Sequence, residues 1–169
     1  LGEDKSRLLI AINQADQAMK GRHWNDDANQ PEQKLIDFLN EKVDSTKQRI
    51  YEATKVNVEP IYYAAGYKDG DEQQYPWNLS KLLAHILKHT PQKKRILISQ
   101  PLNDNPKVWE SDDRLEKYQE QVRQNFLDSF IANVSDGLGK AIKTVSDIAS
   151  TAINVGKTIV STASTIISS

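Results

Sequence analysis

The sequence predicts an α/β fold in residues 1–100 followed by an α-helical region in residues 101–169. Two short apolar runs, residues 7–12 and 59–66, flank a segment with helical periodicity, which is the pattern of a parallel βαβ unit. After Pro106 the composition changes, first to a charged amphipathic helix and then to a segment rich in small residues. These observations predict a small sheet with crossover helices and a helical C-terminal appendage.

The first predicted strand, residues 7–12, ends directly in Asn13-Gln14-Ala15-Asp16. These residues resemble the Asn-Lys-x-Asp guanine-specificity motif of P-loop GTPases. The resemblance implies that the Asp16 carboxylate accepts N1–H and the exocyclic amino group of guanine. It also implies that Asn13 faces the O6/N7 edge and that the Gln14 stem covers one face of the ring, with weaker stacking than the usual Lys. The alternative is a strand that ends in an Asx turn and binds no ligand.

The segment between the two strands is predicted to be one amphipathic helix over residues 31–54. Pro31 stands where a first-turn proline is tolerated, and charged residues fill the polar face. Its apolar residues recur at helical spacing: Leu35, Ile36, Phe38, Leu39, Val43 and Ile50. This helix makes the right-handed crossover between two parallel strands.

The second predicted strand, residues 59–66, ends in Ala64-Ala65-Gly66. This ending resembles the Ser-Ala-x motif of Era- and TrmE-like GTPases, in which the Ala backbone N–H donates to guanine O6. Ala64 stands in place of the Ser and lacks its hydroxyl. A further helix is predicted over residues 77–87 and is ended by Thr90-Pro91.

The order of these elements resembles the YfjP/YeeP-like GTPases of the Era group over nearly the whole chain. The resemblance implies the C-terminal part of a P-loop GTPase sheet that binds GTP or GDP. The Gly-x-x-x-x-Gly-Lys-Ser/Thr phosphate loop is absent, because Gly156-Lys157-Thr158 has Thr151 where the first glycine is needed. Since the chain also begins at Leu1, we expect a half-domain whose phosphate contacts, Mg²⁺ and hydrolysis come from a missing N-terminal half. The alternative is a non-catalytic helical interaction or assembly module.

Composition limits the cellular location and the binding partners that we expect. The formal net charge of −1 argues against direct DNA binding, which needs a basic stripe. The absence of cysteine is typical of a cytoplasmic protein and excludes thiolate metal sites. His85 and His89 lie four residues apart without a third ligand, so we expect two solvated imidazoles and no metal.

The end of the chain carries a seam of apolar and small residues at alternating steps of three and four. Its members are Ile142, Val145, Ala149, Ala152, Gly156, Ile159, Ala163 and Ile166. This coiled-coil pattern predicts intramolecular packing, a homo-oligomer, or peripheral membrane contact. A transmembrane span is disfavoured because Lys140, Lys143, Asp147 and Lys157 interrupt the apolar window. The charged helix before it is predicted over residues 112–134.

Overall fold

A parallel strand pair joined by a long helix begins the fold. The computed structural model describes residues 8–70, 72–99 and 101–135 and has a mixed α/β fold with small sheets. Strand β1 (Ala11–Ile12) pairs in parallel with β4 (Ile61–Tyr62), with Ala11 opposite Ile61. The Ile61 N–H donates to Ile10 O at 3.1 Å and the Tyr63 N–H to Ile12 O at 2.9 Å. The predicted βαβ order is confirmed, and both strands are shorter than their apolar runs.

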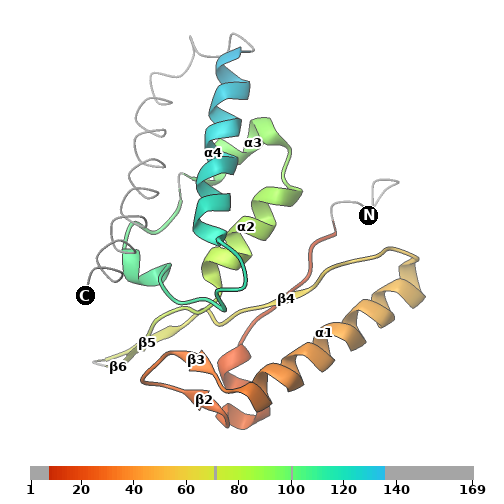
Figure 1. Ribbon diagram of the computed structural model, residues 1–169, viewed down its shortest axis with the longest axis vertical. Coiled ribbons are helices and arrows are strands. Elements are labelled where there is room, and N and C mark those ends of the chain that lie inside the picture. The colour runs from red at the N-terminus through yellow and green to blue at the C-terminus, as the bar shows by residue number, and fades with distance from the viewer. Residues whose placement is uncertain (1–7, 71, 100, 136–169) are drawn as a thin grey trace.

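Helix α1 (Gln33–Thr54) is the crossover between these strands. It begins two residues later than predicted because Pro31 belongs to β3 (Gln30–Pro31), which pairs with β2 (Trp24–Asn25). The helix ends where Lys55 adopts a left-handed conformation and donates its N–H to Tyr51 O at 2.8 Å. Figure 1 shows α1 on one side of the β1 and β4 pair and the helices that follow residue 78 on the other.

One hairpin interrupts the βαβ order between β1 and α1, a second hairpin follows β4, and the sequence pattern predicted neither. The first, β2 and β3, follows the 3₁₀ segment η2 (Ala15–Gly21), whose course is broken where Ala18 is extended and Met19 and Lys20 are left-handed. The second pairs β5 (Tyr67–Asp69) with β6 (Glu72–Gln74). The strands of the first hairpin are only two residues long, and those of the second lack an apolar face, since all three residues of β5 are exposed. Periodicity therefore could not reveal them.

The first hydrophobic core is organised around Trp77, whose ring is almost completely buried. The ring stacks on Tyr62, with ring centroids 5.9 Å apart. It makes an edge-to-face contact with Trp24, with ring centroids 5.7 Å apart. The buried members of this core are Ala15, Leu35, Leu39, Tyr62, Ala64 and Trp77. It thus joins the segment after β1, α1 and β4 in one packed unit.

Helices α2 (Leu79–His89), α3 (Gln92–Ile98) and α4 (Tyr118–Ser135) form a second packed unit. Its buried members are Leu83, Ala84, Leu87, Trp109, Tyr118, Val122 and Phe126. Helix α3 was not predicted, and the predicted division after residue 100 runs between helices that pack together, since α4 contacts both α2 and α3. The short segment η3 (Pro106–Val108) precedes α4.

Helix α4 begins at Tyr118 and not at Asp112 as predicted, because the aspartates before it form turns. The Asp112 and Asp113 carboxylates accept the backbone N–H groups of Arg114 and Leu115 at 2.7 and 3.2 Å. Such side-chain bonds compete with helix formation. Arg114 also has a positive φ of 53°. The helical start is thereby delayed until Tyr118.

Predictions about the end of the chain fall outside the described residues. The small-residue seam of residues 142–166, with its intramolecular, homo-oligomeric and membrane alternatives, belongs to that part. Among the residues that the structure describes, no helix is long and apolar enough to cross a membrane.

Asn78 connects the two packed units. It is fully buried, its side-chain N–H₂ donates to Tyr62 O at 3.2 Å, and its side-chain oxygen accepts the Asp113 N–H at 2.8 Å. The Asp113 carboxylate in turn pairs with Lys81 at 2.6 Å. Burial, followed by the nearby Asp113 charge, raises the pKa of Tyr118 above its ordinary value. One amide side chain therefore joins β4 to the segment before α4.

Replacing Asn78 with Ala should lower the free energy of unfolding by about 1–3 kcal/mol, because the partly buried Asp113 N–H and the buried Tyr62 carbonyl oxygen each lose a partner. Ala also tolerates the positive φ of 59° at this position less well than Asn. Urea unfolding would measure the change. Asn57→Ala, at an exposed position, is the control and should stay within about 0.5 kcal/mol of the parent chain. Equal stabilities of the two variants would contradict the connecting role of Asn78.

Candidate functional site

Two loops meet where the parallel strands end. The first loop, residues 13–17, follows β1, and the second loop, residues 64–66, follows β4 after Tyr63. The carboxyl ends of parallel strands lie at one edge of a sheet, which is where α/β proteins bind ligands. The Ala15 N–H donates to Tyr63 O at 3.1 Å and ties the loops together. All six predicted site residues lie in or beside this junction; Asn13, Gln14, Ala65 and Gly66 are exposed or partly exposed, whereas Asp16 and Ala64 are buried.

The first loop holds its polar side chains at different depths. Asn13 and Gln14 are exposed, and the Asn13 side-chain oxygen accepts the Gln14 N–H at 2.7 Å. Gln14 adopts a left-handed conformation with φ 61°, and its carbonyl accepts the Gln17 N–H at 3.0 Å. The chain therefore turns sharply after β1, as an Asn-containing turn permits.

Asp16 is the buried acid of this loop, with only 7% of its surface exposed. Its side-chain Oδ2 accepts a hydrogen bond from the Gln17 side-chain amide at 2.8 Å. Within the described ranges this is the one recorded partner of the carboxylate. A buried carboxylate is costly unless donors surround it, so Asp16 has acceptor capacity available for further donors.

The second loop separates a structural residue from an accessible one. Ala64 is completely buried and exchanges both backbone hydrogen bonds with Trp77, at 3.0 and 2.9 Å. Its N–H is therefore already used, so Ala64 positions the loop and does not itself offer a donor. Ala65 is exposed, and no partner is recorded for its N–H in the described part of the chain.

Sequence reasoning missed two residues of this arrangement, Trp77 and Gln17. Trp77 was assigned to a helix, but its backbone pairs with Ala64 and its ring fills the core beneath both loops. Gln17 directly follows the motif and belongs to no recognised pattern. Its adjacency to Asp16 is the signal that could have indicated a contact.

A groove of about 430 Å³ adjoins the second loop on the side of the β5 and β6 hairpin. Ala65 and Gly66 line it together with Pro76, Leu102 and Trp109, whereas Asp16 does not. The groove therefore offers space beside the Ala65 amide and is not itself the junction between the loops.

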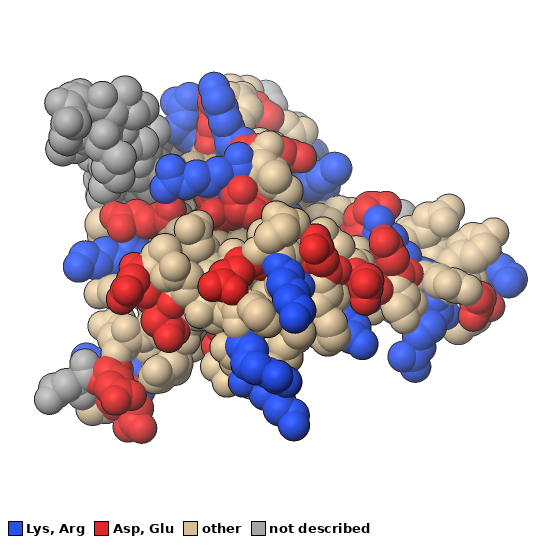
Figure 2. All heavy atoms as spheres, turned by 60° about the horizontal axis from the view of Figure 1, so that its bottom comes forward, with Lys and Arg blue, Asp and Glu red and all other residues tan. Residues whose placement is uncertain are grey.

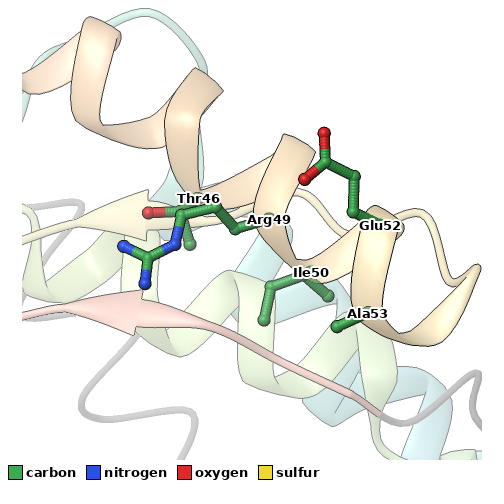
Figure 3. A pocket seen from close by; sticks show the side chains of 5 residues that line it. All are labelled: Thr46, Arg49, Ile50, Glu52 and Ala53. Atoms are coloured by element: carbon green, nitrogen blue, oxygen red, sulfur yellow. The ribbon is translucent and has the colours of Figure 1, made fainter.

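A separate hollow lies along the C-terminal half of α1 (Figure 3). Its described lining residues, Thr46, Arg49, Ile50, Glu52 and Ala53, all belong to this one helix. Figure 3 shows the Glu52 carboxylate and the Arg49 guanidinium pointing in different directions. Because no polar groups converge there, the hollow lacks the arrangement of a ligand-binding site.

Charged side chains do not separate by sign on the visible face of the molecule. In Figure 2, Lys and Arg are interspersed with Asp and Glu across that face, including the part formed by α1. A nucleic-acid interface is typically a basic stripe, and this face lacks one.

The histidines of α2 differ from the prediction of two solvated imidazoles. Both are partly buried, their rings are in edge contact at 4.6 Å, and the His89 Nδ1–H donates to His85 O at 2.8 Å. Burial, and then the positive charges of His89 and Lys88, lower the pKa of His85 below its ordinary value. In the described residues no group of three ligands that could hold a metal is present.

Replacing Gly66 with Ala should destabilise the second loop more than the same change at Gly70. Both glycines have positive φ, 71° and 56°, which costs Ala about 1–2 kcal/mol. At Gly66 alone the new methyl group would also overlap Gln74 O and approach Pro76 N within 2.9 Å, whereas Gly70 has open space. Thermal melts of the two variants separate the steric effect from the conformational one, and equal melting temperatures would exclude the close approach.

The free energy of unfolding should fall as the pH drops through 6.5, the ordinary pKa of histidine. The folded state holds His85 neutral below that pH while the unfolded chain takes up a proton, so acidification favours unfolding. Urea titrations at several pH values should show a weaker pH dependence in His85→Gln than in the parent chain. An unchanged pH dependence in His85→Gln would contradict the lowered pKa.

Comparisons of the chain with family models, curated proteins and solved structures found no match.

Proposed function

We propose that this chain binds the guanine base of GTP or GDP at the junction of the two loops. The observation that carries the proposal is the hydrogen bond from Ala15 N–H to Tyr63 O, 3.1 Å long. It holds the loop of Asp16 beside the loop of Ala65, so that a carboxylate acceptor and an available amide donor belong to one junction.

The two groups are complementary to one base. Guanine presents an acceptor at O6 and donors at N1–H and its exocyclic amino group. The Ala65 N–H suits O6, and the two Asp16 oxygens suit the two donors. Adenine has an amino group in place of O6 and no proton on N1, so it would leave these groups unpaired, which binding sites penalise strongly.

Asn13 and Gln14 have supporting roles in this proposal. Both side chains are exposed beside Asp16, so they are available to a base held there. The Asn13 amide would face the O6/N7 edge, and the Gln14 stem would cover one face of the ring. These roles follow from the resemblance to the Asn-Lys-x-Asp motif.

The proposal concerns base recognition and leaves phosphate binding to other groups. The sequence has no Gly-x-x-x-x-Gly-Lys-Ser/Thr loop, which would cradle phosphates and supply the Mg²⁺ hydroxyl. Binding of Mg²⁺ and hydrolysis of GTP would therefore need a phosphate-binding half such as the Era-like resemblance implies. Base contacts alone should give weak, millimolar affinity.

A helical interaction module is the second candidate, and one observation favours it. Helices α2, α3 and α4 enclose a core of their own, so they could act as a unit without any ligand. This candidate does not explain the exposed Ala65 amide beside the loop of the buried Asp16. The proposed cytoplasmic location and possible peripheral membrane contact suit either candidate.

The decisive substitution is Asp16→Asn, which turns an acceptor at the base edge into a donor. Guanosine monophosphate (GMP) should lose about tenfold or more in affinity, because two donors then face each other. Xanthosine monophosphate should gain, since xanthine has a carbonyl oxygen where guanine has its amino group. Titrations of the ¹⁵N-labelled full chain, followed by NMR at the Ala65 and Gln17 amides, measure both.

The control is Asp37→Asn, an exposed carboxylate on α1 that should leave both affinities unchanged. A gain for the xanthine nucleotide cannot result from simple loss of folding. If the parent chain gives no saturable shifts with GMP, or if the Asp16 variant binds both nucleotides as the parent does, base recognition at this junction is wrong.

A further inference from the structure

Resting on the proposed function, we infer that Gln17 competes with guanine for Asp16 and thereby sets how strongly the site distinguishes guanine from hypoxanthine. The Gln17 side-chain amide donates to Asp16 Oδ2 at 2.8 Å. It occupies one of the two carboxylate oxygens that a guanine base would use.

The contact satisfies a charge that burial would otherwise leave poorly solvated. Asp16 is 7% exposed, and within the described residues its carboxylate accepts a hydrogen bond from Gln17. Hydrogen bonds to a charged group are stronger than those between neutral groups. The Asp16 carboxylate is therefore stabilised by a donor of the same kind that guanine carries, an N–H₂ group.

Gln17 can release the carboxylate without moving the loop. Its side chain lies at an exposed position, and its backbone N–H is bonded separately to Gln14 O at 3.0 Å. Rotation about the side-chain bonds alone would free Oδ2, and water could then solvate the displaced amide. The exchange replaces one donor on Asp16 by another.

The competition applies to some purines only. Guanine needs both carboxylate oxygens, one for N1–H and one for its amino group, and so must share Oδ2 with the Gln17 amide or displace it. Hypoxanthine has N1–H and O6 but no amino group, so it needs one oxygen and leaves Gln17 in place. The Gln17 contact therefore weakens guanine binding selectively and narrows the difference between the two bases.

The experiment compares GMP with inosine monophosphate (IMP) in the full chain and in Gln17→Met, which keeps side-chain length but has no donor. NMR titration of the labelled chains measures each affinity. In Gln17→Met, GMP should bind about three- to tenfold more tightly, as expected for release of one competing hydrogen bond. IMP should change by less than about twofold, since its single bond to Asp16 does not displace Gln17.

The matched control is Gln33→Met, because Gln33 donates to Asp37 at the same 2.8 Å on the exposed side of α1. It should change neither affinity. If Gln17→Met changed the affinities for GMP and IMP by the same factor, Gln17 would have only a structural role and the inference would be overturned. Unchanged or weaker GMP binding would also overturn it while leaving base recognition intact. If the parent chain did not bind GMP at all, both the role of Gln17 and the proposed base recognition would be wrong.

Discussion

The interaction on which the rest of the structure depends is the pairing of Trp77 with Ala64. Their backbones exchange two hydrogen bonds, at 3.0 and 2.9 Å, and the Trp77 ring packs between Tyr62 and Trp24. The strand pair β1 and β4 is only two residues long, so its own hydrogen bonds cannot define a sheet. The Trp77 contact supplies the missing constraint: it fixes the end of β4 and thereby the position of Ala65. It also leads directly to Asn78, which connects this core to the helices.

The parts of the fold that could be predicted from the sequence are those with a strong apolar period. Helix α1 follows from residues at helical spacing such as Leu35 and Leu39, both of which are buried. The parallel order of β1 and β4 follows because a crossover helix separates two apolar runs. The loops were predicted from their position after these strands, and their hydrogen bond at Ala15 agrees with a shared edge. Base recognition at this edge is a proposal that rests on motif chemistry.

What could not be predicted depends on contacts between distant or polar residues. The β5 strand is fully exposed and has no period, and the delayed start of α4 comes from Asp112 and Asp113 bonding to their own backbone. Trp77 looked like a helical residue because nothing local shows that Ala64, thirteen positions earlier, takes its backbone bonds. The same holds for the histidines of α2, whose partial burial depends on packing. Local pattern is a weak guide wherever tertiary contacts determine the backbone.

For the guanine site that we propose, the burial of Asp16 explains why a competing donor lies beside it. A carboxylate that discriminates between bases must be shielded from water, because water would replace a missing donor and weaken the penalty for a wrong base. Burying a carboxylate, however, destabilises the fold unless a hydrogen-bond donor compensates its charge. Gln17 resolves this conflict: its amide bonds Oδ2 at 2.8 Å, while its exposed position lets it move aside. In the proposed site, selectivity and stability are thus linked through one side chain, and strengthening that contact would stabilise the loop at the expense of the proposed guanine affinity.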